Sequence, residues 1–183
     1  MAAAERTHAG LRLRSFAFAL DYVLIAIYLV VLVVAGGILS RTLPSIARSL
    51  FDNPIWGQAT GFIVVTLPVT LYFTLLEASS WQASWGKRKM HLVVTDMDGE
   101  RISLTRSLSR TVLKFIPWEL AHLCIWQVSF ALDKTSPIFT AGFALVWLLV
   151  AIYIMSMLIS PTRQTVYDRL AGAFVLKQGC DRR

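Results

Sequence analysis

The decisive stretch is Phe16–Leu39, FAFALDYVLIAIYLVVLVVAGGIL, a 24-residue run in which Asp21 is the single charged residue. An α-helix rises ~1.5 Å per residue, so this run exceeds the ~30 Å hydrocarbon thickness of a bilayer. The run is too long for the apolar region of a signal peptide, and no clear small-x-small cleavage site closes it. The sequence therefore predicts a membrane-spanning helix here.

Two further runs have the same character. One is Ile55–Leu76, which contains Pro68, and the other is Ile138–Ile159, which ends at Ser160 and Pro161. Proline is tolerated in a membrane helix where neighbouring groups satisfy the carbonyl that it frees, so we expect a kink rather than a break at Pro68. Both runs are predicted to span.

A fourth stretch, Thr111–Leu132, is long enough to span but contains Lys114, Pro117, Glu119 and His122 among its polar and helix-breaking residues. The distribution of basic residues indicates whether this stretch crosses the membrane. Lys and Arg concentrate before the first run, between residues 77 and 110, and after the last run, and they are sparse in the other loops. If 111–132 crosses, all three basic blocks lie on the cytoplasmic side, as the positive-inside rule requires. Four spans are therefore expected, with the third buried against its neighbours.

Composition supports this class of protein. The 183 residues are 56% hydrophobic and only 16% charged, with a net charge of +7, whereas soluble domains are nearer one quarter charged. The basic residues stand in blocks between apolar runs, with no basic face interleaved with aromatics, so nucleic acid is not an expected partner. Cys124 and Cys180 lack metal or redox spacing. No catalytic constellation is visible, so we expect neither an enzyme nor a cofactor.

The segment 86–110 differs from the apolar runs. Its residues His91–Thr95 are mostly β-branched or apolar, an Asp-Met-Asp-Gly turn follows at 96–99, and Arg101–Leu104 could return as a second strand. This pattern predicts a cytoplasmic β-hairpin. Ala173–Leu176 is short and apolar enough to add a third strand.

After the hairpin, Ser103 or Thr105 could cap a basic amphipathic helix that runs through Arg110. Such a helix is suited to the anionic cytoplasmic leaflet. Taken together, the sequence predicts a single domain over residues 1–183. We expect an all-α membrane protein: a four-helix transmembrane bundle with a small cytoplasmic β-hairpin, both termini cytoplasmic, in the cell membrane.

Asp21 lies within the first turns of the first span. An ionised Asp near the middle of a membrane helix costs roughly 2.5–3.5 kcal/mol, and less near the interface. Arg14 is on the same helix face but about 10 Å away along the axis, so it cannot be the sole direct partner. A second cation is implied, and the candidates are Arg163, Arg169 and Arg88.

The segment after the last span carries Arg163, Asp168 and Arg169 close to the membrane boundary. One interpretation is an ion-pair lock that holds the first and last spans together beside the hairpin. The other is a polar site for an ion or a proton. The position near the interface favours the lock, and ionisable groups within the membrane keep the second interpretation open.

Glu119 and His122 share a helix face in the predicted third span. Glu-x-x-His is a spacing used by di-metal helix bundles, but those sites need a second copy, and this chain has one. A buried, hydrogen-bonded pair is therefore favoured over a metal site, with a proton relay as the intermediate case because His titrates near neutral pH.

Lys87, Arg88 and Lys89 form a basic cluster after Gly86. The cluster lacks the second glycine and the spacing of a phosphate-binding loop. It is expected to lie at the membrane boundary and to face anionic lipid head groups.

These pieces, taken in order, resemble the RDD family of mostly bacterial membrane proteins, named for one arginine and two aspartates. The resemblance runs from about residue 12 to residue 176. By position, the naming residues would be Arg14, Asp21 and Asp168. Tyr167 and Trp85 depart from the residues common in the family. The order that carries the resemblance is Arg14…Asp21, Glu77, Trp85-Gly86-Lys87-Arg88, Leu92-Val93-Val94, Asp98-Gly99, Ser103-Leu104, Arg106…Arg110, and Arg163…Asp168-Arg169-Leu170-Ala171-Gly172.

The resemblance implies a role in transport, because the family is usually described in those terms and one member has been linked to sodium/proton antiport. The first hypothesis is therefore a cation/proton exchanger that uses Asp21 with Asp168 and Arg14, with Glu77, Arg163 and Arg169 as supporting charges. A chain this short would act as a homo-oligomer or in a larger membrane complex. The alternative is a non-catalytic scaffold or accessory subunit that binds partner proteins or anionic lipid.

Overall fold

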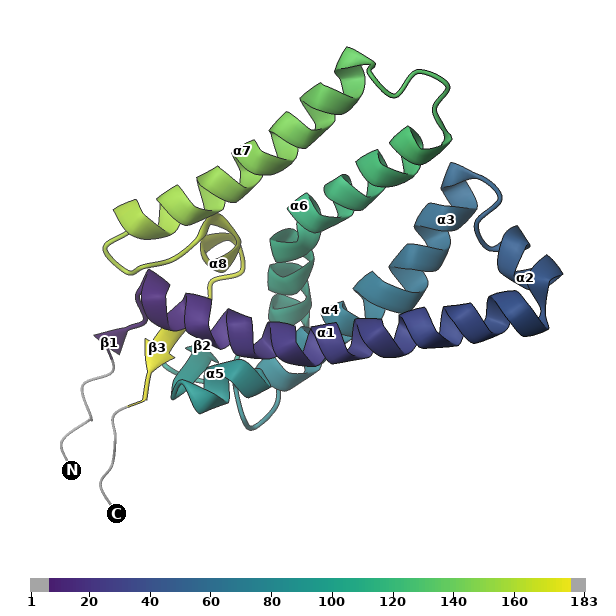
Figure 1. Cartoon of the computed structure of the whole chain (residues 1–183). Helices are drawn as coiled ribbons and strands as arrows, with labels where there is room; N and C mark the ends of the chain where they lie inside the picture. Colours follow the sequence, from purple (N-terminus) through teal and green to yellow (C-terminus); the bar gives the residue numbers. More distant parts are fainter. Residues whose placement is uncertain (1–6, 179–183) are drawn as a thin grey trace, which may run out of the picture. The chain divides into compact units, whose positions relative to one another are not determined.

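The computed structural model describes residues 7–178, and the chain divides into two compact units (Figure 1). The described parts of the first, which we call the sheet unit, are residues 7–23, 70–114 and 151–178. The second, the helical unit, consists of residues 24–69 and 115–150.

The three strongest apolar runs are helical. They form α1 (Leu11–Thr42), α7 (Pro137–Ile159) and the segment Pro54–Glu77, which is built from α3 (Pro54–Gly61), a π-helical turn η1 (Phe62–Thr66) and α4 (Leu67–Glu77). Within residues 7–178 these are the helices long and apolar enough to cross a membrane. Three of the predicted spans are thereby supported, with ends that extend the predicted ones by up to five residues.

The predicted fourth span, 111–132, overlaps α6 (Leu104–Phe130), a continuous helix of 27 residues that ends two residues before the predicted end. α6 is not among the helices that meet the requirements of length and apolar composition, so a four-helix transmembrane bundle is not confirmed. The amphipathic helix expected as a separate element is the first part of α6. Ser103 caps it, because its Oγ accepts the backbone N–H of Arg106 at 3.3 Å. The short α2 (Pro44–Ser49) follows α1.

The strands form one small antiparallel sheet in the order β1-β3-β2. Its strands are β1 (Thr7–His8), β2 (Leu92–Thr95) and β3 (Phe174–Lys177). The predicted third strand near residue 175 is confirmed and lies at the centre of the sheet.

The predicted β-hairpin is wrong in its second arm. The turn at 96–99 forms, but Arg101 pairs with Thr95 only through an isolated bridge. On the side of β2 that the arm would use, the N–H of Val94 already donates to the carbonyl of Gln82 at 2.7 Å. Each backbone N–H donates to one ladder, so this N–H is not free to pair β2 with the returning segment. The returning segment therefore does not form a second strand.

The core of the sheet unit joins the sheet to the amino-terminal end of α1. Figure 1 shows the strands and α5 (Trp85–Lys89) beside that end, and α8 (Val166–Leu170) completes the unit. Burial of these side chains removes apolar surface from water and holds the two ends of the described chain together. The buried cluster consists of Ala9, Ala17, Leu92, Val94, Ile102, Ala171, Ala173 and Val175. Cys124 is a buried free thiol, and Cys180 lies outside the described residues.

Two helix-interior prolines have matching tyrosine partners. Proline cannot donate to the carbonyl four residues before it. For Pro68 that carbonyl belongs to Val64, and the Tyr28 hydroxyl donates to it at 2.6 Å. For Pro117 it belongs to Leu113, and the Tyr153 hydroxyl donates to it at 2.7 Å. The expectation that a neighbour satisfies the carbonyl freed by Pro68 is confirmed, and the same solution recurs at Pro117.

We expect Tyr28→Phe and Tyr153→Phe each to lower the free energy of unfolding by about 1–3 kcal/mol, because each leaves a helix carbonyl without its donor. Thermal unfolding of the detergent-purified protein measures this loss. Tyr22→Phe is the matched control, because Tyr22 is an exposed tyrosine on the same helix as Tyr28. Equal melting temperatures for all three variants would contradict the assignment.

Candidate functional site

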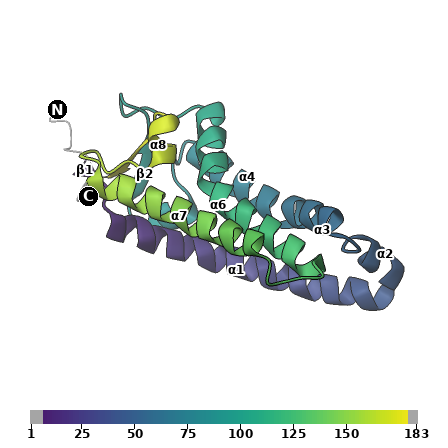
Figure 2. The same ribbon diagram turned by 90° about the horizontal axis from the view of Figure 1, so that it is seen from above.

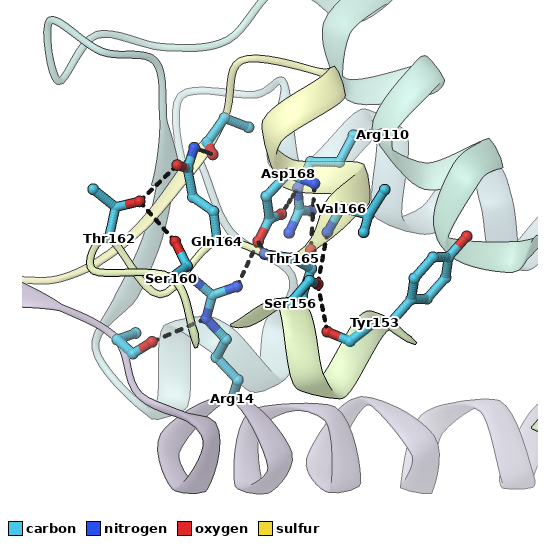
Figure 3. A network of polar contacts seen from close by, with 12 residues as sticks. Arg14, Arg110, Tyr153, Ser156, Ser160, Thr162, Gln164, Thr165, Val166 and Asp168 are labelled. Atoms are coloured by element: carbon cyan, nitrogen blue, oxygen red, sulfur yellow. Dashed lines mark hydrogen bonds and ion pairs between the residues drawn. The ribbon is translucent and has the colours of Figure 1, made fainter. Parts of the chain in front are cut away.

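A buried charged cluster occupies the sheet unit, and we define it as Arg14, Glu77, Lys87, Arg110 and Asp168. The side chains come from α1, α4, α5, α6 and α8 and are between 0% and 12% exposed. Figure 3 shows Arg14 and Arg110 converging on Asp168. Charges this far from water require pairing and hydrogen bonds to be tolerated.

Both carboxylate oxygens of Asp168 accept hydrogen bonds. Its Oδ2 accepts Arg14 Nη1 at 2.6 Å and the backbone N–H of Thr165 at 3.2 Å, and its Oδ1 accepts Arg110 Nε at 2.7 Å. Thr165 caps α8 and completes a capping box, because its hydroxyl accepts the N–H of Asp168 at 3.3 Å. Asp168 is therefore both a helix-capping residue and the shared anion of two arginines.

Arg110 connects the two carboxylates of the cluster. Its Nε donates to Asp168, while its Nη1 donates to Glu77 Oε2. Lys87 Nζ reaches the other oxygen of Glu77 at 2.5 Å. The order Arg14, Asp168, Arg110, Glu77, Lys87 alternates in sign, so each carboxylate lies between two cations. A planar guanidinium with several fixed donors is suited to such a bridge.

Aromatic rings lie close to two cations of the cluster and to Lys114. Lys114 Nζ lies 3.4 Å and Lys87 Nζ 5.5 Å from the centre of the Phe73 ring, and the Arg110 guanidinium lies 5.4 Å from the centre of Tyr167. Cation–π attraction partly replaces the water that these groups have lost.

The loop between α7 and α8 holds Asp168 in position. The Ser156 hydroxyl accepts the N–H of Val166 at 3.0 Å. Gln164 donates to the carbonyl of Ala173 at 2.9 Å, and Thr162 bridges Ser160 and Gln164 (Figure 3). These contacts tie α8 to the end of α7 and to the start of β3.

Asp21 occupies a separate site in the same unit and is 1% exposed. The Tyr72 hydroxyl and the backbone N–H of Gly86 donate to Oδ1, each at 2.7 Å, and the Ser84 hydroxyl donates to Oδ2 at 2.6 Å. The expectation of a second cation was wrong. Three hydrogen-bond donors stabilise the carboxylate, a role that a neighbouring charge would otherwise fill.

Gly86 makes that site possible. A Cβ at this position would lie 2.0 Å from the carbonyl oxygen of Ala17 and 2.9 Å from the Asp21 carboxyl carbon. The start of α5 can approach α1 this closely only without a side chain, and that approach is what brings the N–H of Gly86 to Asp21.

The remaining predicted cations lie in different surroundings. Arg163 and Arg169 are exposed, and neither is a partner of Asp21 or Asp168. Arg88 and Lys89 are also exposed and lie 4.0 Å and 5.8 Å from the ring centres of Trp81 and Trp85, respectively. Of the predicted basic cluster, Lys87 instead turns inward to Glu77.

Glu119 and His122 lie in the helical unit, apart from the charged cluster. His122 Nδ1 is 3.5 Å from Glu119 Oε1. The closer donors to Glu119 are the Thr66 hydroxyl and Gln58 Nε2, the latter at 2.9 Å. The structure brings the predicted pair together and adds two partners that the sequence did not indicate.

Arg110 is the central residue that sequence reasoning missed as a site residue, because it was counted only among the cytoplasmic charges. A signal was present. Ser107, Arg110, Thr111 and Lys114 recur at helical spacing and share one face of α6, and the first three of these are at most 2% exposed.

The stability that the Asp168 ion pairs give the folded protein depends on pH. Burial raises the pKa of the Asp168 carboxyl, but Arg110 and Arg14 outweigh burial and hold the pKa below its usual range. A lowered folded pKa means that the unfolded state binds more protons near pH 4. The stabilisation is complete above the unfolded pKa of about 3.9 and is lost as the pH falls through the folded pKa.

We therefore expect a melting temperature in detergent that changes little from about pH 8 to about pH 5 and falls steeply below about pH 4. Melting curves across this range at fixed ionic strength test the expectation. A melting temperature that stays constant down to about pH 2 would contradict it.

The long apolar helices, the small sheet that joins the two ends of the described chain and the buried ion pairs define a multi-pass helical protein of the membrane type. The RDD family model matches residues 8–172, nearly the whole chain. The chain belongs to the RDD family, and the resemblance inferred from its motifs is confirmed. Comparison with curated proteins and with solved structures gives no match.

Proposed function

We propose that this RDD-family chain is a non-catalytic membrane scaffold or accessory subunit and that its charged cluster is a structural lock. One observation carries the proposal: all four carboxylate oxygens of Asp21 and Asp168 accept hydrogen bonds from this chain while the two residues are at most 1% exposed.

A transported ion or proton needs a carboxylate with free lone pairs or a path to water. Asp168 is instead held by two arginines, and Asp21 by three donors with distances of 2.6 to 2.7 Å. Removing one partner of such a buried arrangement leaves an uncompensated polar group, which costs far more than it would at a surface. This geometry favours a fixed architecture over a binding site that empties and fills.

The proposed placement puts α6 across the cell membrane as the third of four spans and both termini in the cytoplasm. Basic residues on the sheet unit then face the anionic leaflet. Arg88 and Lys89 support this placement, because they lie over the rings of Trp81 and Trp85, which are 51% and 37% exposed. Paired tryptophans and cations are typical of the head-group level of a membrane, so anionic lipid is the proposed direct partner.

Cation/proton exchange by a homo-oligomer is the second candidate. Its support is the polar set around Glu119, which lies on membrane-length helices and includes His122, whose Nδ1 is 3.5 Å from Glu119 Oε1. In this variant of the proposal, Asp21 and Asp168 hold the helices and Glu119 takes part in exchange.

Proteoliposomes that contain a pH-sensitive dye separate the two candidates. Under sodium or potassium gradients, the scaffold predicts no proton movement by the purified wild-type protein. Asp21→Asn should lower the free energy of unfolding by about 1–3 kcal/mol, because one oxygen that accepts a hydrogen bond becomes a donor.

Asp52→Asn serves as the control, because Asp52 is an exposed aspartate in the helical unit. Proton flux by the wild type that disappears in a well-folded Asp21→Asn protein would overturn the scaffold and place Asp21 in a transport pathway. Flux that survives Asp21→Asn but is lost in Glu119→Gln would favour the second candidate.

A further inference from the structure

The first part of α6, residues 104–114, carries an apolar strip on the surface of the sheet unit. Leu104, Leu108 and Val112 follow one another at intervals of four residues, so they lie on one side of the helix within about 80° of arc. These residues are 55%, 43% and 49% exposed. The strip is therefore an accessible surface that extends over about two helical turns.

The polar residues of the same segment are turned inward. Ser107, Arg110 and Thr111 are at most 2% exposed. The Ser107 hydroxyl donates to the carbonyl of Thr74 at 2.8 Å, and Arg110 pairs with two buried carboxylates. A helix on a surface that faces water turns its charged side outward and its apolar side to the core. This segment does the reverse, so its strip fits an apolar solvent better than water.

Arg106 lies on the side of the helix opposite to the strip. At ~100° per residue, it is about 160° from Leu108 around the helix axis. Its side chain is 55% exposed and lies 4.0 Å from Asp96. The segment thus has an apolar side, a charged side opposite to it and a polar flank against the buried cluster. This arrangement is typical of a helix at the boundary between hydrocarbon and water.

The strip adjoins a membrane-length helix of the same unit. The Tyr153 hydroxyl of α7 donates at 2.7 Å to the carbonyl of Leu113, the residue after Val112. This part of α7 exposes its own apolar residues, among them Ile154 and Leu158. Figures 1 and 2 show the first part of α6, in teal, running across the direction of the start of α1. A segment that crosses a membrane-length helix in this way runs along a bilayer surface.

We propose that the first part of α6 is an interfacial membrane helix, with Leu104, Leu108 and Val112 among lipid acyl chains and Arg106 directed to water. The apolar side of such a helix enters the boundary between head groups and acyl chains by about 5–10 Å. The sequence predicted a contact through basic residues, but Arg110 is turned inward, so the contact is with hydrocarbon. The inference rests on the proposed placement of α6 in the membrane and holds for a scaffold and an exchanger alike.

Spin labels at single cysteines test this surface in the full chain. Cys124 and Cys180 are first replaced by alanine, and each labelled variant is reconstituted into vesicles of phosphatidylcholine and phosphatidylglycerol. Electron paramagnetic resonance measures how strongly each label is relaxed by oxygen, which concentrates among acyl chains, and by a nickel chelate, which stays in water. Leu108→Cys tests the strip, and Leu104→Cys repeats the test if the first variant does not fold.

Three further positions serve as references. Met97→Cys places a label in the turn at 96–99, where Met97 is 82% exposed, and Arg106→Cys places one on the charged side of the helix. Ile125→Cys labels an exposed position in the second part of α6. We expect oxygen to relax the labels at 108 and 125, with loss of the nickel effect that is seen at 97 and 106, because a polar complex is excluded from hydrocarbon.

Melting curves establish that each variant is folded. Strong relaxation by nickel at residue 108 would overturn the inference, because the strip would then face water. Weak relaxation by both reagents at 108 would also overturn it and indicate that a second copy or a partner protein covers the strip. The label at residue 125 separates this failure from a failure of the proposed placement. Nickel relaxation at 125 would contradict the crossing of α6 itself, whereas oxygen relaxation there leaves the crossing in place.

Discussion

Arg110→Met should lower the free energy of unfolding by about 3–5 kcal/mol, because it strands two buried carboxylates at once. Asp168 loses the donor at Oδ1, and Glu77 loses the donor at Oε2. Both carboxylates are completely buried, so water cannot replace the guanidinium. Thermal and denaturant unfolding of the detergent-purified protein would measure the loss, and a low yield of folded protein would accompany it.

Two controls separate charge from geometry. Arg106→Met removes an arginine one turn earlier on α6, where the side chain is 55% exposed and lies 4.0 Å from Asp96, so we expect a change below about 1 kcal/mol. Arg110→Lys keeps the charge but loses the fork that reaches two carboxylates, so it should recover only a minor part of the stability.

A double-mutant cycle tests whether the bridge is the cause. Glu77→Leu leaves Lys87 and Arg110 without their shared anion and should itself destabilise. The pair Arg110→Met with Glu77→Leu should cost less than the sum of the two single changes, because no stranded carboxylate remains at position 77. Strict additivity, or a loss after Arg110→Met no larger than after Arg106→Met, would refute the role assigned to Arg110.

Gly86→Ala is expected to cost about 3 kcal/mol, an unusually large effect for one methyl group. The new Cβ would meet the backbone oxygen of Ala17 at 2.0 Å, and a backbone atom cannot move aside as a flexible side chain can. Relief of the clash requires α5 to move away from α1, and that movement withdraws the Gly86 N–H from Asp21. Overpacking and a lost hydrogen bond to a buried carboxylate therefore act together.

Gly10→Ala is the matched control, because a Cβ at that position meets no atom within 4 Å. Gly86→Ala should also be strongly non-additive with Asp21→Asn, since both changes break the same contact. A melting temperature for Gly86→Ala equal to that of Gly10→Ala would show that the approach of α5 to α1 is looser than described.

The long helices were predictable because hydrophobic runs of bilayer length leave few alternatives. The helix that contains the apolar run from Phe16 begins earlier, at Leu11. Its first turn contains Arg14, which belongs to the charged cluster. The third strand was predictable from the short apolar stretch near Val175, whereas the missing hairpin arm was not. The carbonyl of Gln82 takes the N–H of Val94, and a contact of that kind leaves no trace in a pattern of side chains.

Asp21 shows why the site itself was harder to predict. A cation was expected because a carboxylate in a membrane span needs a partner and Arg14 lies too far along the helix, but the partners are two hydroxyls and one backbone N–H, none of which carries charge. Arg110 was hidden for the opposite reason, because a basic residue at a membrane boundary already had an explanation in the positive-inside rule. The polar residues Ser107 and Thr111, which are buried at helical spacing from it, were the better guide to its burial.

The central position of β3 sets an order on biosynthesis. β1 and β2 leave the ribosome long before β3, yet each pairs with β3 and not with the other. Asp168, which neutralises Arg14 and Arg110, is also among the last of these groups to be made. A nascent chain that stops before Asp168 therefore leaves Arg14 and Arg110 without this shared anion and β1 and β2 without their common partner strand, and unpaired strand edges favour aggregation. Formation of the sheet and closure of the charged cluster therefore both wait for the segment from Asp168 to Lys177.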